Sequence, residues 1–271
     1  MKKMSTVLII TLLLVCANLS HAYAAFEWPV SEWKIDFIGT MKSPDGFSAV
    51  EVKDFRNFID QEKQGLLNPK KGKTDKSRQD SAGKQMPEVP AGTPAILKEA
   101  LPKDSEAAKK RFLKSDFAMY HLSMDDGQAI HTAWFLAFRD GEAMPEAVDV
   151  FTKDLTPEQT EKLAEFKKWV DENLHKAQYT DEKNKVSMKL LEVMPLQALP
   201  LQDGKKIWTA GGRVVIRAEG MPFAFFARAY AMNIDERLAV GILAGFDGER
   251  PFWDPVVRDM FLELRETPVA K

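Results

Sequence analysis

Four apolar runs in the last third of the chain follow one another with only short turn sequences between them. Asp203-Gly204, Gly220-Met221-Pro222 and residues 233–236 provide these turns, and glycine, proline and asparagine are typical turn residues. Short runs joined by tight turns pair readily with their neighbours, so the pattern predicts an antiparallel meander. We expect its strands at residues 186–201, 205–218, 223–232 and 237–246, with a β-bulge at Gly211-Gly212.

The residues after the meander predict a helix that packs on it. Asp254 would cap this helix and Pro255 would occupy its first position. An apolar stripe follows at the spacing of one helix face, formed by Val256, Val257, Met260, Phe261 and Leu264. Small residues would let the helix approach the strands closely, namely Ala227, Ala229, Ala231, Ala239, Gly241 and Gly245.

A hairpin and two helices are predicted before the meander. Residues 117–124 and 129–139 are rich in aromatic and apolar side chains and flank the turn Asp125-Asp126-Gly127. Residues 105–114 predict a helix, and Thr156-Pro157-Glu158-Gln159 is a capping box that opens another, running to about residue 176. The fold class is therefore α+β: a hairpin plus a four-strand antiparallel meander, packed by helices in a manner similar to an α/β/α sandwich.

The first 24 residues have the pattern of a secretory signal peptide. Lys2 and Lys3 precede an apolar run at residues 7–15, and Ala22-Tyr23-Ala24 offers a small–x–small cleavage site. The run is shorter than the about 20 apolar residues that span a membrane. We expect export to the periplasm or the exterior, with no span after cleavage. Cys16 could mark a lipoprotein site instead, but a bulky valine precedes it.

Composition shifts divide the rest of the chain. Between residues 70 and 84 the chain has six basic residues and a single apolar side chain, so nothing there offsets the entropy of ordering. Before this stretch we expect a strand at 33–38 and a helix at 48–61, whose apolar face is Val52, Phe55, Phe58 and Ile59. The predicted segments are a signal peptide (1–24), an N-terminal strand and helix (25–61), a flexible polar insertion (62–93) and the main α+β domain (94–271).

The order of these elements resembles a known fold family. Two strands, a helix, four antiparallel strands and a last helix that begins near Trp253, with Ala229-Tyr230-Ala231 in the sheet, are similar to the Mog1/PsbP-like α/β/α sandwich. The resemblance covers about residues 117–265. Members include photosystem accessory proteins, small-GTPase binders and secreted bacterial proteins without assigned activity. The resemblance implies a binding or assembly role rather than catalysis.

Two histidines flank the hairpin turn, and the turn length decides whether they meet. A three-residue loop at 125–127 pairs His121 with His131, whereas a two-residue loop pairs His121 with Thr132 and sends His131 to the other face. We favour the first register because it buries more bulk together. Paired imidazoles could bind zinc or copper and would lower each other's pKa. The alternative is two ordinary half-buried polar residues.

Arginines of the meander form a second candidate site. The turn predicted above places Arg213 opposite Arg228, with Arg217 two pairs along on the same face. Facing like charges are unfavourable unless an anion lies between them, so these residues could bind a carboxylate or phosphate ligand. Alternatively, acids of the protein itself such as Glu192 or Glu219 neutralise them, or they extend into water.

No motif specifies a reaction or a cofactor, and a net charge of −2 does not favour nucleic acid. We expect a secreted bacterial envelope protein without catalytic activity that binds a partner protein or a small anionic ligand. The alternative is a hydrolase or metal-dependent enzyme that uses His121 and His131.

Overall fold

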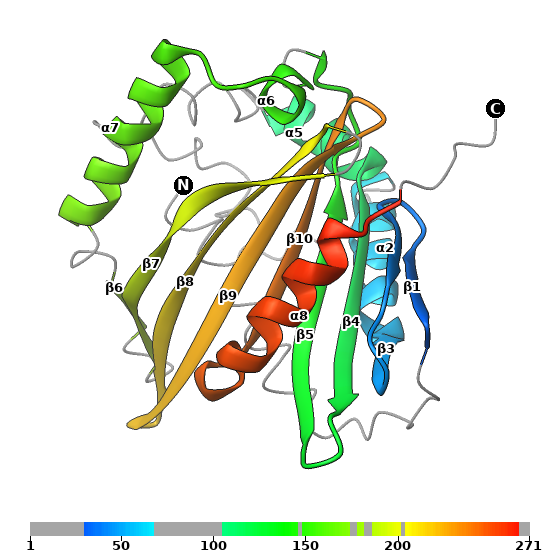
Figure 1. Cartoon of the computed structure of the whole chain (residues 1–271), viewed down its shortest axis with the longest axis vertical. Helices are drawn as coiled ribbons and strands as arrows, with labels where there is room; N and C mark the ends of the chain where they lie inside the picture. Colours follow the sequence, from blue (N-terminus) through cyan, green and yellow to red (C-terminus); the bar gives the residue numbers. More distant parts are fainter. Residues whose placement is uncertain are drawn as a thin grey trace, which may run out of the picture.

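The computed structural model describes residues 30–67, 105–145, 148–173, 178–181, 186–201 and 204–265. Its main feature is a fully antiparallel sheet in the order β3-β4-β5-β10-β9-β8-β7-β6, which confirms the α+β class (Figure 1). The strands are β3 (Phe47–Glu51), β4 (Asp116–Asp125), β5 (Ile130–Arg139), β6 (Gln178–Asp181), β7 (Val186–Pro200), β8 (Lys206–Ala218), β9 (Met221–Ile234) and β10 (Arg237–Phe246).

Helices and a small hairpin cover the two faces of this sheet (Figure 1). One face, the α8 face, carries α8 (Arg250–Leu262), which follows the 3₁₀ turn η4 (Asp247–Glu249), and the hairpin of β1 (Glu32–Ile35) and β2 (Gly39–Lys42). The other, the α2 face, carries α2 (Lys53–Leu67), α5 (Ser105–Lys114) and α6 (Val148–Thr152). α7 (Pro157–Asn173) lies beside β7.

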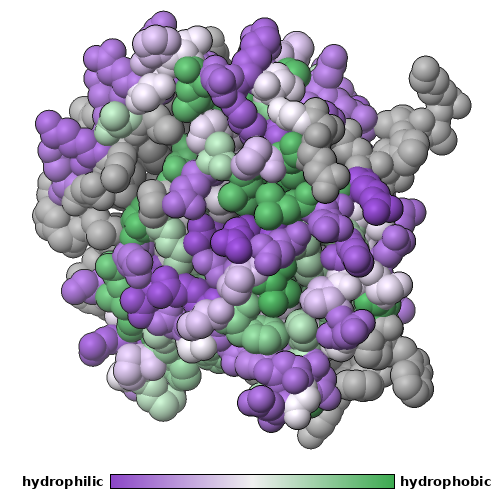
Figure 2. Space-filling model, in the orientation of Figure 1, coloured by the Kyte–Doolittle hydropathy of each residue, from purple (hydrophilic) through white to green (hydrophobic). Residues whose placement is uncertain are grey.

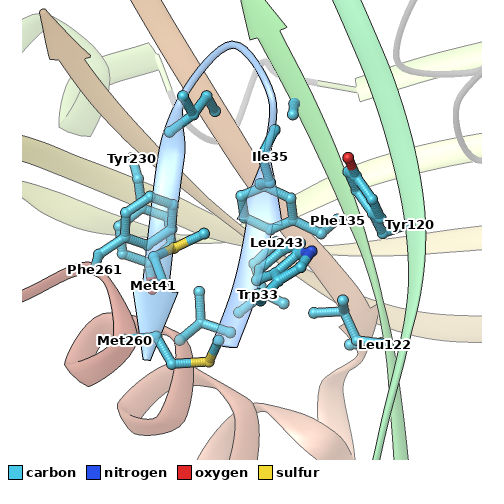
Figure 3. Packing of buried hydrophobic residues seen from close by; sticks show 14 of the residues in the cluster. Trp33, Ile35, Met41, Tyr120, Leu122, Phe135, Tyr230, Leu243, Met260 and Phe261 are labelled. Carbon is cyan, nitrogen blue, oxygen red and sulfur yellow. The ribbon is translucent and has the colours of Figure 1, made fainter. Parts of the chain in front are cut away.

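The hydrophobic core lies between the α8 face, α8 and the β1–β2 hairpin (Figure 3). Trp33 and Ile35 of β1 point onto the sheet, where the Trp33 and Phe135 rings are 4.9 Å apart. Phe261 of α8 stacks on Tyr230 of β9 at 4.6 Å. The hairpin and the last helix therefore share one core with the sheet, although they lie at opposite ends of the sequence.

The structure corrects the prediction for the N-terminal segment. The strand expected at 33–38 is a hairpin, and residues 47–51 form the edge strand β3, so the helix expected at 48–61 begins at Lys53 and ends at Leu67. Phe47 is fully buried and pairs with Met124, and this strand burial overrides the helical spacing. The residues predicted to face inward from α2 do not reach the core: Phe58 is 46% exposed.

Several other local predictions are confirmed. α5 spans the predicted residues, and β4 and β5 form the predicted hairpin. In the capping box the amide of Gln159 donates to Thr156 Oγ1 (3.2 Å) and the amide of Thr156 donates to Gln159 Oε1 (2.9 Å). The helix that it opens ends at Asn173, slightly before the predicted end, and the short strand β6 was not predicted.

The last helix begins earlier than predicted. α8 starts at Arg250 with Pro251 in its first turn, where a missing amide hydrogen is tolerated, so Asp254 lies inside the helix rather than capping it. Its buried stripe includes Val257 and Phe261, as expected. Aromatic rings, rather than the helix backbone, cover the small residues of β10: a Cβ on Gly241 would lie 2.3 Å from the Phe135 ring.

The predicted signal peptide and the polar stretch at 70–84 lie outside the described residues. Within the described part of the chain, no helix is both long enough and apolar enough to cross a membrane.

Candidate functional site

The structure separates the two hairpin histidines, so the predicted pair is wrong. Asp125 pairs with Ile130, which makes a four-residue loop, and His121 therefore lies opposite Trp134 rather than His131. Aspartate side chains fix this loop: Asp126 Oδ1 accepts hydrogen bonds from the amides of residues 128 and 129, each at 2.8 Å. The histidines lie on opposite faces of the sheet and cannot share a metal ion. Among the described residues, no three His, Cys, Asp or Glu side chains group to hold one.

His131 lies on the α8 face and connects the hairpin loop to the start of α8. Its ring stacks on Phe252, with centroids 3.6 Å apart. Nδ1 lies 3.1 Å from Glu249 Oε2, and Nε2 lies 3.3 Å from Asp126 Oδ2. Both ring nitrogens thus lie within hydrogen-bond distance of a carboxylate, so His131 links the hairpin loop to the residue before α8.

His121 lies on the α2 face between Val50 and Trp134, and its ring centroid is 4.7 Å from that of Trp134. Burial lowers the pKa of His121 from its ordinary value. The direction agrees with the prediction for the pair, but the cause is desolvation and not a second imidazole.

This lowered pKa predicts a loss of stability in mild acid. The unfolded chain binds the proton of His121 more readily than the folded protein, so the free energy of unfolding decreases as pH falls below about 6.5. The variant His121→Gln should lack this part of the pH dependence, because a glutamine side chain does not bind the proton. NMR titration of the ring, assigned with the same variant, should give a midpoint below about 6.5. A midpoint at or above that value would contradict the prediction.

The arginines of the meander also have a register that differs from the prediction. The β8–β9 turn is Glu219-Gly220, both residues with positive φ (50° and 84°), as in a type I′ turn. Arg213 consequently lies opposite Phe226, and Arg228 lies opposite Gly211. The shift is two residues, so Arg213 and Arg228 still share the α8 face. The bulges lie in β7, between residues 190 and 192 and between 194 and 197, and not at Gly211-Gly212.

Acids of the protein itself neutralise two of these arginines. Arg213 Nε donates to Asp247 Oδ1 at 2.7 Å, and Nη1 donates to Glu192 at 3.2 Å, as the alternative had anticipated for Glu192. The bond from Arg213 holds the pKa of Asp247 below its ordinary value. Arg228 binds Asp254 through Nε and Nη2, at 2.7 and 2.6 Å. Arg217 is exposed. No anion is needed to hold Arg213 and Arg228 side by side.

A cavity of about 400 Å³ opens at the C-terminal end of α8, which we call the terminal cavity. Buried side chains form its floor and charged residues its rim; it is lined by Phe151, Leu201, Lys205, Lys206, Met232, Asn233, Ile234, Leu262, Glu263, Leu264 and Arg265. A patch of hydrophobic surface is visible beside this end of α8 (Figure 2). The volume lies within the range of about 300–1,000 Å³ that is typical of small-molecule sites.

Three separate segments position the cations of this cavity. The carbonyl of Lys205 accepts a hydrogen bond from the amide of Leu201 at 2.7 Å, and Lys206 follows as the first residue of β8. Arg265 is held by two backbone hydrogen bonds to Thr40 of β2, at 2.8 and 2.9 Å. Gly39 permits this approach, because a Cβ there would lie 2.4 Å from the carbonyl oxygen of Arg265.

The rim is more basic than acidic. Three cations face one lining carboxylate, Glu263. Lys206 Nζ binds the exposed Asp154 (2.6 Å) and the carbonyl of Lys153 (2.9 Å), whereas the side chain of Arg265 forms no ion pair with another described residue. These residues carry no signal in the sequence, because they come from segments that are distant in sequence and meet only in the fold.

Comparison with known proteins assigns no family. No model of a known protein family matches the chain, and the curated proteins contain no match. One similar solved structure is PA94 from Pseudomonas aeruginosa, a protein of unknown function; it is 14% identical over 57% of this chain and 85% of that chain, with a TM-score of 0.31. Values this low transfer no function.

Proposed function

We propose that this protein is an exported, non-enzymatic binding protein of the bacterial envelope that holds a small anionic ligand with an apolar part in the terminal cavity. The observation that carries the proposal is the combination of a basic rim and a buried apolar floor in one cavity of about 400 Å³. The element order that resembles the Mog1/PsbP-like sandwich also fits a binding role.

The floor of the cavity suits a short hydrocarbon group. Phe151, Met232 and Ile234 are at most 6% exposed and belong to the packed interior, so an apolar group placed against them leaves water at little conformational cost to the protein. Burial of each methylene contributes about 0.8 kcal/mol. Several methylenes therefore suffice for micromolar binding when a charged group adds to them.

The rim suits the anionic group. Arg265 offers a planar guanidinium, which matches a carboxylate or phosphate with two parallel hydrogen bonds, and its backbone is fixed by Thr40. Lys205 and Lys206 add positive charge on the opposite, β8 side. The ligand class is thus a carboxylate or phosphate attached to a short apolar chain.

Decanoate is a suitable probe, and calorimetric titration of the protein beginning at Ala25 should show saturable binding. Acetate lacks the chain and decyltrimethylammonium reverses the charge, so each should compete with decanoate for the terminal cavity at least about tenfold more weakly than unlabelled decanoate does. Arg265→Gln should weaken decanoate binding by about tenfold, because one charge-assisted interaction is lost. Lys110→Gln, an exposed lysine of α5 far from the cavity lining, is the matched control and should have no effect. Equal binding of decanoate and decyltrimethylammonium would contradict the proposal.

The export part of the proposal has its own test. Material secreted by a bacterial host should have an intact mass that begins at Ala25, because signal peptidase cleaves after Ala22-Tyr23-Ala24. Changing Ala24 to Tyr should block cleavage and leave the longer chain. A diacylated N-terminus at Cys16 would contradict the assignment.

A further inference from the structure

A second, smaller cavity lies beneath the middle of α8, which we call the polar cavity. Its volume is about 130 Å³, and it lies between the helix and strands β7, β8 and β9. The lining is predominantly polar: Gln197, Leu199, Thr209, Arg228, Tyr230, Asp254, Pro255 and Arg258. It shares no lining residue with the terminal cavity, so any role that it has goes beyond the proposed function.

Two hydroxyl groups of this cavity are buried without a partner. Tyr230 is 0% exposed and Thr209 is 2% exposed, and neither hydroxyl oxygen has a hydrogen bond in the described structure. The two residues are direct partners across β8 and β9, so their side chains leave the same face of the sheet together. Buried hydroxyls are nearly always hydrogen-bonded in folded proteins, so this pair indicates that a further molecule completes the site.

The ring of Tyr230 is held in place independently of its hydroxyl. It stacks on Phe261 of α8 at 4.6 Å with an interplanar angle of 18°. Burial, followed by the nearby Asp254 carboxylate, raises the pKa of Tyr230 above its ordinary value, so the phenol keeps its proton. A fixed, protonated phenol is a hydrogen-bond donor that loses little entropy when a ligand binds.

The charged residues of the cavity add a surplus of donors. Arg228 uses Nε and Nη2 to bind Asp254, and its side chain is only 16% exposed. Arg258 binds the exposed Asp259 through the same two nitrogens, at 3.1 and 3.0 Å. These bonds leave the Nη1 group of each guanidinium, which carries two N–H donors. Each guanidinium is therefore paired with one aspartate and still has donors left over for a further acceptor.

We propose that the polar cavity binds a small oxyanion, whose oxygens accept hydrogen bonds from Tyr230, Thr209 and the free guanidinium nitrogens of Arg228 and Arg258. The volume admits a few non-hydrogen atoms, which corresponds to inorganic phosphate or a short carboxylate such as acetate. Both ions share the required chemistry, namely several oxygen acceptors on a compact anion. The site ties β8 and β9 to α8 through the bound ion.

The test is the thermal stability of the full mature protein in phosphate, in acetate and in chloride at matched ionic strength. A ligand that binds only the folded state stabilises it by mass action, so the melting temperature rises as the ligand concentration increases. We expect phosphate or acetate to produce such a rise, whereas chloride should not. Calorimetric titration with each ion then identifies whether phosphate or acetate binds more tightly. No specific rise with either ion would overturn the proposal and leave a cavity filled by water only.

Conservative variants separate a ligand site from simple burial. Tyr230→Phe keeps the ring against Phe261, and Thr209→Val keeps the shape, so each removes only a hydroxyl. Each should weaken oxyanion binding by about tenfold, as loss of one hydrogen bond to a charged ligand predicts. Without the ion both variants should be as stable as the parent or more so, because an unpartnered buried hydroxyl is removed.

Two further variants complete the design. Arg258→Gln changes an exposed side chain and should weaken binding without unfolding the protein. Tyr120→Phe, a buried tyrosine of β4 outside the cavity, is the matched control and should leave oxyanion binding unchanged. If the hydroxyl variants and the control bind the ion equally well, the ion binds elsewhere and the proposal is wrong. Decanoate binding in the terminal cavity should persist in every variant, which distinguishes failure of this site from failure of the proposed function.

Discussion

Replacing Trp253 with alanine should lower the free energy of unfolding by about 3–5 kcal/mol, the range measured for large buried aromatic residues. Trp253 is 0% exposed and lies on the side of α8 that faces the core. Its ring meets Phe47 of β3 edge to face at 6.4 Å and Phe252 at 5.3 Å. The side chain thus joins the last helix to the edge strand at the other end of the chain, and neither partner could fill the space it leaves.

Urea unfolding measures this effect as a lower midpoint with an unchanged slope, provided that the native state stays compact. Phe58→Ala is the matched control, because Phe58 is 46% exposed on α2 and alanine favours helix. We expect this control to change the free energy of unfolding by no more than about 0.5 kcal/mol. A loss below about 1 kcal/mol for Trp253→Ala would show that α8 contributes little to the core.

Local patterns predicted much of the fold. The turn at 233–236 and the capping box at Thr156 each depend on a few neighbouring residues, and the structure has both where the sequence predicts them. The meander, the hairpin and α5 follow from the same kind of signal. The edge strand β3 was missed because its pairing with β4 depends on residues that are distant in sequence, and Phe47 gains burial only when that partner is present.

The candidate sites were harder to predict for a related reason. An odd-numbered shift in register moves every side chain of a strand to the other face, and the shift of three residues at the β4–β5 loop separated His121 from His131. The shift at Glu219-Gly220 was two residues and left Arg213 and Arg228 on one face, but their acid partners lie in η4 and α8. Residues from several elements line each of the two cavities, and neither composition nor residue spacing predicts that these residues lie together.

Replacing Asp140 with alanine should lower the free energy of unfolding by about 3–5 kcal/mol, since it leaves a charge without its partner. The side chain of Asp140 is 3% exposed and binds Arg111 Nε through both oxygens, at 2.7 and 2.6 Å. It also accepts a hydrogen bond from the amide of Glu142 at 3.1 Å. The pair fixes α5 to the end of β5, where Gly141 packs so closely that a Cβ would lie 2.3 Å from Lys114.

A double-mutant cycle separates the value of this pair from the penalty of an unpaired charge. Arg111→Met combined with Asp140→Ala removes both charges, and we expect it to be more stable than Asp140→Ala alone, because no partly buried guanidinium remains without a carboxylate. The exposed pair of Lys34 and Asp36 is the control, with side chains 59% and 79% exposed; Asp36→Ala should change the free energy of unfolding by less than about 1 kcal/mol. If the losses for Arg111 and Asp140 simply add, the two residues act independently, and the junction of α5 and β5 depends on packing at Gly141 rather than on charge.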